Sequence, residues 1–213
     1  NEGCPPTIIE QLQYRQEQAK TSQYWKNWCK VYIDGEVGTL EGVVYSDWAI
    51  TNERPTEGKV VYGLDFAFNV PTALVKVTIL PKTITVEQMI YQTGLTNGDL
   101  IIRMKGLGIP YRAPIYCDAA EPDRIEELRR AGFNAKAAAK DVELGIDSVK
   151  QKMVFIHSES LDVIREIRGY RYDTDNDGKV LETPVKENDH ALDALRYAVF
   201  TDSKAPTGVY VIR

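Results

Sequence analysis

Three aspartates lie in segments where an isolated negative charge would be costly. Asp65 and Asp118 interrupt or end apolar, strand-like stretches, and Asp193 lies between two Ala-Leu pairs. Burying one unpaired carboxylate is strongly unfavourable or forces its protonation. Three such carboxylates coexist at low cost if they converge on cations. Carboxylates that hold two hard divalent ions, about 4 Å apart, are the usual arrangement for phosphodiester hydrolysis.

A histidine accompanies one of these acids on the helix expected near the C-terminus. His190 and Asp193 are three residues apart, so their side chains lie on the same side of the helix and could hold one metal ion together. Leu192 and Leu195 belong to the opposite stripe, which we expect to face the core. The second histidine, His157, follows an apolar run and is interpreted as a strand-end residue.

Each acid taken alone also has a purely structural interpretation. Asp65 could end a strand and face solvent, and Asp118 could anchor the N-terminus of the helix that follows it. Asp193 could lie on a solvated helix face together with Asp189 and Arg196. The metal-site hypothesis therefore depends on the three acids meeting in space.

Turn and capping signals divide the chain from residue 58 onward into short elements. We expect strands over 60–66, 72–80, 83–91, 113–117, 135–139 and 153–156. We expect helices over 97–106, 122–131, 160–168 and 189–201, one more between the last two strands, and a hairpin over 171–182. Three antiparallel-type strands followed by alternating helices and strands indicate an α/β fold with a mixed sheet flanked by helices on both faces.

The first part of the chain has a different character. Residues 7–30 are expected to form a polar, amphipathic helix, and a polar stretch bounded by Pro and Gly over 51–58 marks a domain boundary. We therefore expect two parts, 1–57 and 58–213. Because the sequence starts without methionine, we also expect a fragment or a processed product.

Composition limits the possible classes of protein. The three cysteines, Cys4, Cys29 and Cys117, have no CxxC spacing, which argues against a disulfide framework or a thiolate zinc site and suits a reducing cytosol. No membrane span and no signal peptide is expected. The net charge of −5 is unusual for a dedicated nucleic-acid binder. Metal ions would offset a carboxylate cluster, however, and tethering to a DNA-handling partner would reduce the affinity that this domain needs.

Three segments together resemble the nuclease domain of tailed-phage large terminases: GLDFAF at 63–68, IYCDAAEP at 115–122 and NDHALDALRY at 188–197. The resemblance covers most of residues 31–202. It implies a ribonuclease H-like fold in which the three segments supply the metal ligands Asp65, Asp118, Asp193 and His190. Residues 31–45 also resemble the stretch that links the packaging ATPase to the nuclease in that family, so 1–57 is expected to be the linker or tail of a preceding packaging ATPase domain.

The resemblance implies an endonuclease that cuts concatemeric double-stranded viral DNA during genome packaging. Two Mg²⁺ or Mn²⁺ ions would activate the attacking water and stabilise the leaving 3′ oxygen, with Asp65 bridging both ions. The implied partners are the ATPase domain of the same polypeptide, the small terminase subunit and the portal protein, in the host cytoplasm. DNA would be held through its phosphates. Candidate contacts are Lys76, Lys105, Arg112, Lys136, Lys140 and Lys186.

Two nucleotide- or ion-binding patterns are absent or incomplete. No G-x-x-x-x-G-K-[ST] loop occurs, so we expect no ATP hydrolysis by this chain. The sequence DTDNDG at 173–178 imitates the start of an EF-hand loop, but Pro184 stands where the bidentate Glu belongs. A hairpin is expected there instead, and the resemblance implies that it leans over the active site and regulates DNA entry.

Two other functions stay open. Another ribonuclease H-like enzyme, of the transposase or resolvase type, would share the acidic triad but would show strand transfer or a preference for junctions. A non-catalytic docking module of the packaging motor would keep the fold and bind no metal.

Overall fold

The computed structural model describes residues 16–17, 20, 42–175 and 179–204. The chain forms two compact units, residues 1–43 and residues 44–213. In the first unit, Glu17 forms an ion pair with Lys20 at 2.6 Å. The rest of the helix expected over 7–30 lies outside the described residues.

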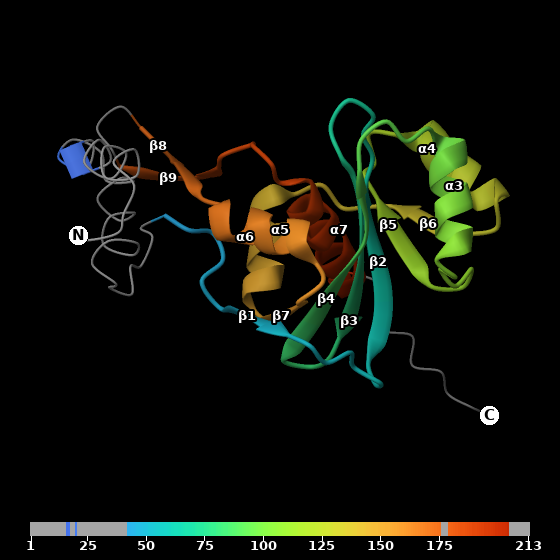
Figure 1. Ribbon diagram of the computed structural model, residues 1–213, viewed down its shortest axis with the longest axis horizontal. Helices are drawn as coiled ribbons and strands as arrows, with labels where there is room; N and C mark the ends of the chain where they lie inside the picture. The colour runs from blue at the N-terminus through green and yellow to red at the C-terminus, as the bar shows by residue number, and fades with distance from the viewer. Residues whose placement is uncertain (1–15, 18–19, 21–41, 176–178, 205–213) are drawn as a thin grey trace, which may run out of the picture. The chain divides into compact units, whose positions relative to one another are not determined.

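The second unit is built on a seven-stranded mixed sheet with the strand order β1-β7-β4-β3-β2-β5-β6 (Figure 1). Its strands are β1 (Trp48–Thr51), β2 (Lys59–Asp65), β3 (Thr72–Ile79), β4 (Thr83–Gln92), β5 (Pro114–Cys117), β6 (Asn134–Ala137) and β7 (Met153–His157). β2, β3 and β4 pair in antiparallel fashion. The outer pairs β2–β5, β5–β6, β4–β7 and β1–β7 are parallel.

Helices cover both faces of this sheet. They are α3 (Asn97–Gly106), α4 (Pro122–Arg130), α5 (Val142–Lys150), α6 (Leu161–Gly169) and α7 (His190–Lys204). α3 and α4 lie on one face, and α5, α6 and α7 lie on the other (Figure 1). β8 (Tyr172–Thr174) and β9 (Val180–Pro184) form a separate antiparallel hairpin. The expected fold class and the expected hairpin are therefore confirmed.

The side-chain alternation of β2 decides which residues face α7. Tyr62 and Leu64 pack into the core under α3 and α4. Val61 packs into the core under α5, α6 and α7. Because successive side chains of a strand point to opposite faces, Gly63 and Asp65 lie on the same face as Val61. The last residue of β2 therefore lies on the α7 side of the sheet.

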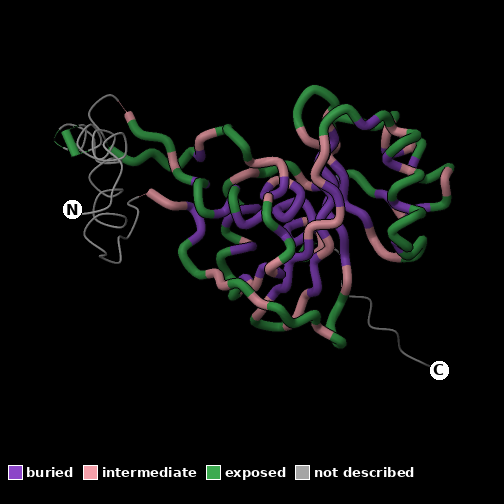
Figure 2. Tube along the Cα trace, viewed as in Figure 1, coloured by how far each residue is buried: buried purple, intermediate pink, exposed green. Residues whose placement is uncertain are grey.

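Local signals set the helix starts as the sequence predicts. Thr96 and Asp99 form a reciprocal capping box at the start of α3. Pro122 occupies the first turn of α4, and the Asp141 side chain accepts the backbone N–H of Leu144 at the start of α5. α7 is the most enclosed of these helices, and the core strands beneath it are buried along much of their length (Figure 2).

The second unit begins earlier than the sequence indicates. The predicted boundary lies between residues 57 and 58, whereas the compact unit starts at Val44. Residues 48–51 form β1, which pairs only with β7 among the described strands, a segment far along the chain. A short edge strand with a distant partner carries no local signal of its membership, which explains the difference. No helix among the described residues is both long enough and apolar enough to cross a membrane.

Candidate active site

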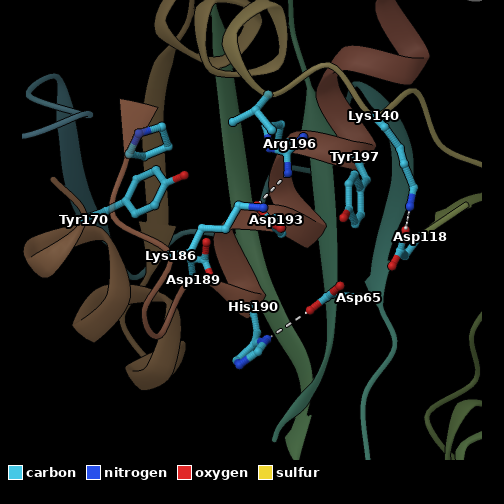
Figure 3. A pocket seen from close by; sticks show the side chains of 12 residues that line it. Asp65, Asp118, Lys140, Tyr170, Lys186, Asp189, His190, Asp193, Arg196 and Tyr197 are labelled. Atoms are coloured by element: carbon cyan, nitrogen blue, oxygen red, sulfur yellow. Dashed lines mark hydrogen bonds and ion pairs between the residues drawn. The ribbon is translucent and has the colours of Figure 1, made fainter. Parts of the chain in front are cut away.

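The ends of two parallel strands bring the first two acids to one edge of the sheet. Asp65 is the last residue of β2, and Asp118 directly follows β5. β5 pairs with β2, and the backbone N–H of Asp118 donates to the carbonyl of Leu64 at 3.0 Å. α7 begins at the same edge and carries His190 and Asp193. All four predicted site residues line one pocket of about 350 Å³ (Figure 3).

Asp65 and His190 interact directly across the pocket. The Oδ2 atom of Asp65 lies 3.0 Å from Nδ1 of His190, and the two side chains are 12% and 20% exposed. Burial raises the pKa of Asp65, and the negative charges of Asp193 and Asp118 add to that rise against the opposing effect of His190. The hydrogen bond to Asp65 raises the pKa of His190. Asp65 is therefore not a solvated strand end, and its environment favours a cation beside it.

Asp118 faces a lysine from the loop after β6. Its Oδ1 atom accepts from Lys140 Nζ at 2.8 Å and from the backbone N–H of Ala120 at 3.0 Å. It does not cap α4, whose N-cap residue is Glu121. The Lys140 side chain is half exposed, so this ion pair lies where solvent can screen it.

Asp193 faces an arginine of its own helix. Its Oδ1 atom lies 2.7 Å from an Nη atom of Arg196. The Asp193 side chain is 25% exposed, whereas that of Arg196 is only 4% exposed. The interpretation that Asp189, Asp193 and Arg196 share a solvated helix face is therefore wrong for Arg196, because α5 packs against it.

A buried glutamate that sequence reasoning missed anchors the start of α7. Glu166 in α6 is 3% exposed, and its Oε2 atom accepts the backbone N–H groups of Ala191 and Leu192 at 2.8 and 3.1 Å. Its Oε1 atom accepts from the Tyr91 hydroxyl at 2.7 Å. Because the first N–H groups of a helix have no partner within the helix, Glu166 satisfies two of them from a neighbouring element. Its helical spacing from Val163, on the buried side of α6, was the available signal.

The basic residues proposed to contact DNA differ in their relation to the pocket. Lys140 and Lys186 line it. Lys76 binds Glu87 at 2.6 Å. The other three are exposed but do not line the pocket: Lys105, Arg112 and Lys136.

The donor set fits divalent ions chemically, although the side chains are arranged around protein cations. Within the described residues, no group of three or more His, Cys, Asp or Glu side chains forms a ready-made metal cluster. Asp118 and Asp193 each direct one oxygen to a cationic side chain, Lys140 or Arg196. Carboxylates and one imidazole are nevertheless ligands that Mg²⁺ and Mn²⁺ accept. Excess negative charge is thus balanced at the positions where ions would balance it.

Comparison with known proteins identifies the class. A family profile described as "Terminase RNAseH like domain" matches residues 69–201, more than half of the 213-residue chain. The chain belongs to this family, the ribonuclease H-like nuclease domain of terminase large subunits. The fold and the three acidic segments of the sequence agree with this membership.

Individual relatives support the same class. The chain is 26% identical over 144 residues to the PBSX phage terminase large subunit of Bacillus subtilis (strain 168), covering 64% of this chain and 33% of that protein. It therefore spans about a third of that relative's length. The nuclease domain of the large terminase g2p from bacteriophage SPP1, with bound Mn, has a TM-score of 0.65 at 20% identity and covers 74% of this chain and 98% of its own. A large terminase from a thermophilic bacteriophage, in complex with ADP, has a TM-score of 0.63 at 23% identity and covers 79% and 47%.

Proposed function

We propose that this domain is a divalent-metal-dependent endonuclease that cuts concatemeric double-stranded viral DNA during genome packaging. The observation that carries the proposal is the pocket itself, because acids from the end of β2, the end of β5 and the first turn of α7 all line it. Burial and the neighbouring carboxylates raise the pKa of Asp65, so a bound cation would relieve the repulsion among these groups. Membership of the terminase family and the Mn-bound SPP1 relative support the same activity.

The residues that would hold two Mg²⁺ or Mn²⁺ ions are Asp65, Asp118 and Asp193, with His190 as a further ligand. When bound, such ions activate water for attack on phosphorus and stabilise the leaving oxygen. Asp65 lies closest to a shared role, because it contacts His190 and its pKa responds to both of the other acids.

The protein's own contribution is to position the acids and to hold the DNA backbone. Lys140 and Lys186 line the pocket and carry charges suited to phosphate oxygens. The chain as a whole has a net charge of −5, so we expect weak, strongly salt-dependent binding of DNA by this domain alone.

We further propose that the domain works beside a packaging ATPase domain in the same polypeptide, with the small terminase subunit and the portal protein, in the host cytoplasm. The chain covers 33% of the PBSX terminase large subunit and 47% of the ADP-bound terminase from the thermophilic bacteriophage. This partial coverage is consistent with a further domain in the natural protein. Residues 1–57 would then contribute the linker to that domain.

A plasmid-cleavage assay tests the activity. The purified chain should nick or linearise supercoiled plasmid with Mn²⁺ and lose this activity in EDTA. Asp65→Ala and Asp118→Ala should abolish cutting while the circular dichroism spectrum stays native. Cleavage that persists in both variants would refute the mechanism. Strand transfer or junction preference would favour a transposase or resolvase type of enzyme, and absence of Mn²⁺ binding would favour a docking module.

A further inference from the structure

Arg196 is a buried cation beside the acids, and its guanidinium is only partly hydrogen-bonded. The residue is 3% exposed, and one Nη atom binds Asp193 Oδ1 at 2.7 Å. In the part of the chain that the structure describes, its Nε and other Nη atoms are buried without a hydrogen-bond partner. A guanidinium buried in this way is costly. The cost implies that the position of this side chain serves a purpose beyond stability.

A glycine in the middle of the neighbouring helix creates the space for Arg196. Gly145 lies inside α5, where glycine is less favourable than alanine by about 1 kcal/mol. A Cβ atom on Gly145 would lie 2.5 Å from Cγ and 2.6 Å from Cδ of Arg196. Such a contact would force the middle of the arginine side chain to move. Gly145 and Arg196 therefore fit each other at the contact between α5 and α7.

We propose that Arg196, seated against Gly145, is a positioning residue that fixes one oxygen of Asp193 and leaves the other oxygen available to a divalent ion. This inference rests on the proposed nuclease function. It assigns Arg196 no contact with DNA or with a metal ion. Its role is to restrict the Asp193 carboxylate to one orientation before an ion arrives.

A role in charge compensation alone makes the opposite prediction for metal affinity. Burial disfavours the charged guanidinium, but the Asp193 carboxylate outweighs that effect and raises the pKa of Arg196, so the side chain stays positive. If its charge were all that mattered, removing it would strengthen Mn²⁺ binding to the acids. If it positions Asp193, removing it should weaken Mn²⁺ binding, because loss of a residue that orients a ligand costs roughly 10- to 100-fold in metal affinity.

The test is calorimetric titration of the complete chain with Mn²⁺. We expect Arg196→Met to weaken Mn²⁺ binding by roughly 10- to 100-fold, and Arg196→Lys, which keeps the charge and most of the chain length, to restore part of the loss. Gly145→Ala leaves every charge in place and should also weaken binding. Gly106→Ala is the matched control, because it changes a helical glycine whose Cβ would meet nothing within 4 Å.

A double-mutant cycle shows whether Gly145 acts through Arg196. Once Arg196 is replaced by Met, adding Gly145→Ala should change Mn²⁺ affinity little further. In the plasmid assay, kcat should fall in both single variants while KM for DNA stays unchanged.

Tighter Mn²⁺ binding by Arg196→Met, or fully additive effects in the cycle, would overturn the positioning role. If Gly145→Ala fails to fold, the comparison of Arg196→Met with Arg196→Lys decides. A wild-type chain that binds no Mn²⁺ would instead refute the proposed function, so the two failures are distinguishable.

Discussion

The backbone of Gly63 lies so close to Ala194 that a Cβ atom on the glycine would be 1.7 Å from the alanine carbonyl oxygen. This contact joins β2 directly to the middle of α7. Asp65 follows Gly63 by two residues on the same face of the strand, and Asp193 precedes Ala194. The absence of a side chain at Gly63 therefore sets how closely α7 can bring its ligands to the end of β2.

Replacing Gly63 with alanine should separate the two elements. Overpacking a close contact costs typically about 1–3 kcal/mol, occasionally more, and backbone atoms cannot yield as a flexible side chain can. We expect Gly63→Ala to lower the free energy of unfolding in urea by at least this amount and to weaken Mn²⁺ binding. Gly106→Ala, at an open position, should do neither. A Gly63→Ala variant as stable as the wild type would contradict the packing described for β2 and α7.

Removing Lys140 should affect metal and DNA binding in opposite directions. Lys140 competes with cations for Asp118, but the pair is partly exposed and screened, so it contributes at most about 1 kcal/mol. Lys140→Ala should therefore tighten Mn²⁺ binding by up to about fivefold. It should also weaken DNA binding and reduce its salt dependence. Filter binding at several salt concentrations measures the second effect, and Lys105→Ala, at an exposed position on α3, is the control. Weaker Mn²⁺ binding by Lys140→Ala would show that Lys140 supports Asp118 rather than competing for it.

The buried carboxyl of Glu166 should make stability depend on pH. Burial raises the pKa of Glu166 from its ordinary value of 4.5 to about 7. Because the folded state holds this proton more tightly, the contribution to stability is full below about pH 4.5 and is lost as the pH rises through about 7. Glu166→Gln keeps an oxygen for the N–H groups of α7 and cannot titrate.

The measurement is the free energy of unfolding in urea across this pH range. The wild type should lose stability relative to Glu166→Gln as the pH rises from about 4.5 to about 7. Glu126→Gln, on the exposed side of α4, should parallel the wild type. Parallel curves for the wild type and Glu166→Gln would rule out the titration.

The sequence was informative wherever a signal is local. The aspartate in an apolar strand, the proline at the start of α4 and the capping box at Thr96 each predict a feature that the structure contains. The order of three acidic segments also indicated the family, which the profile match confirms. These signals lie within a few residues of one another, so no knowledge of the tertiary fold is needed to interpret them.

The remaining features depend on contacts between distant segments. Nothing near Trp48 shows that β1 pairs with β7, and nothing near Lys140 shows that it faces Asp118. Arg196 has the spacing of a solvated neighbour of Asp193, and only the approach of α5 at Gly145 reveals that it is buried. Sequence reasoning therefore identified acids that share a pocket, but it missed the residues that hold them in position.

The central claim is that Asp65, Asp118 and Asp193 bind divalent ions together. Anomalous diffraction from a crystal soaked in Mn²⁺ tests this most directly. We predict two anomalous peaks in the pocket that these acids line, with Asp65 contacting both, and loss of at least one peak in Asp118→Ala. A soaked crystal without a peak in this pocket, or with Mn²⁺ bound only at the hairpin of β8 and β9, would contradict the claim.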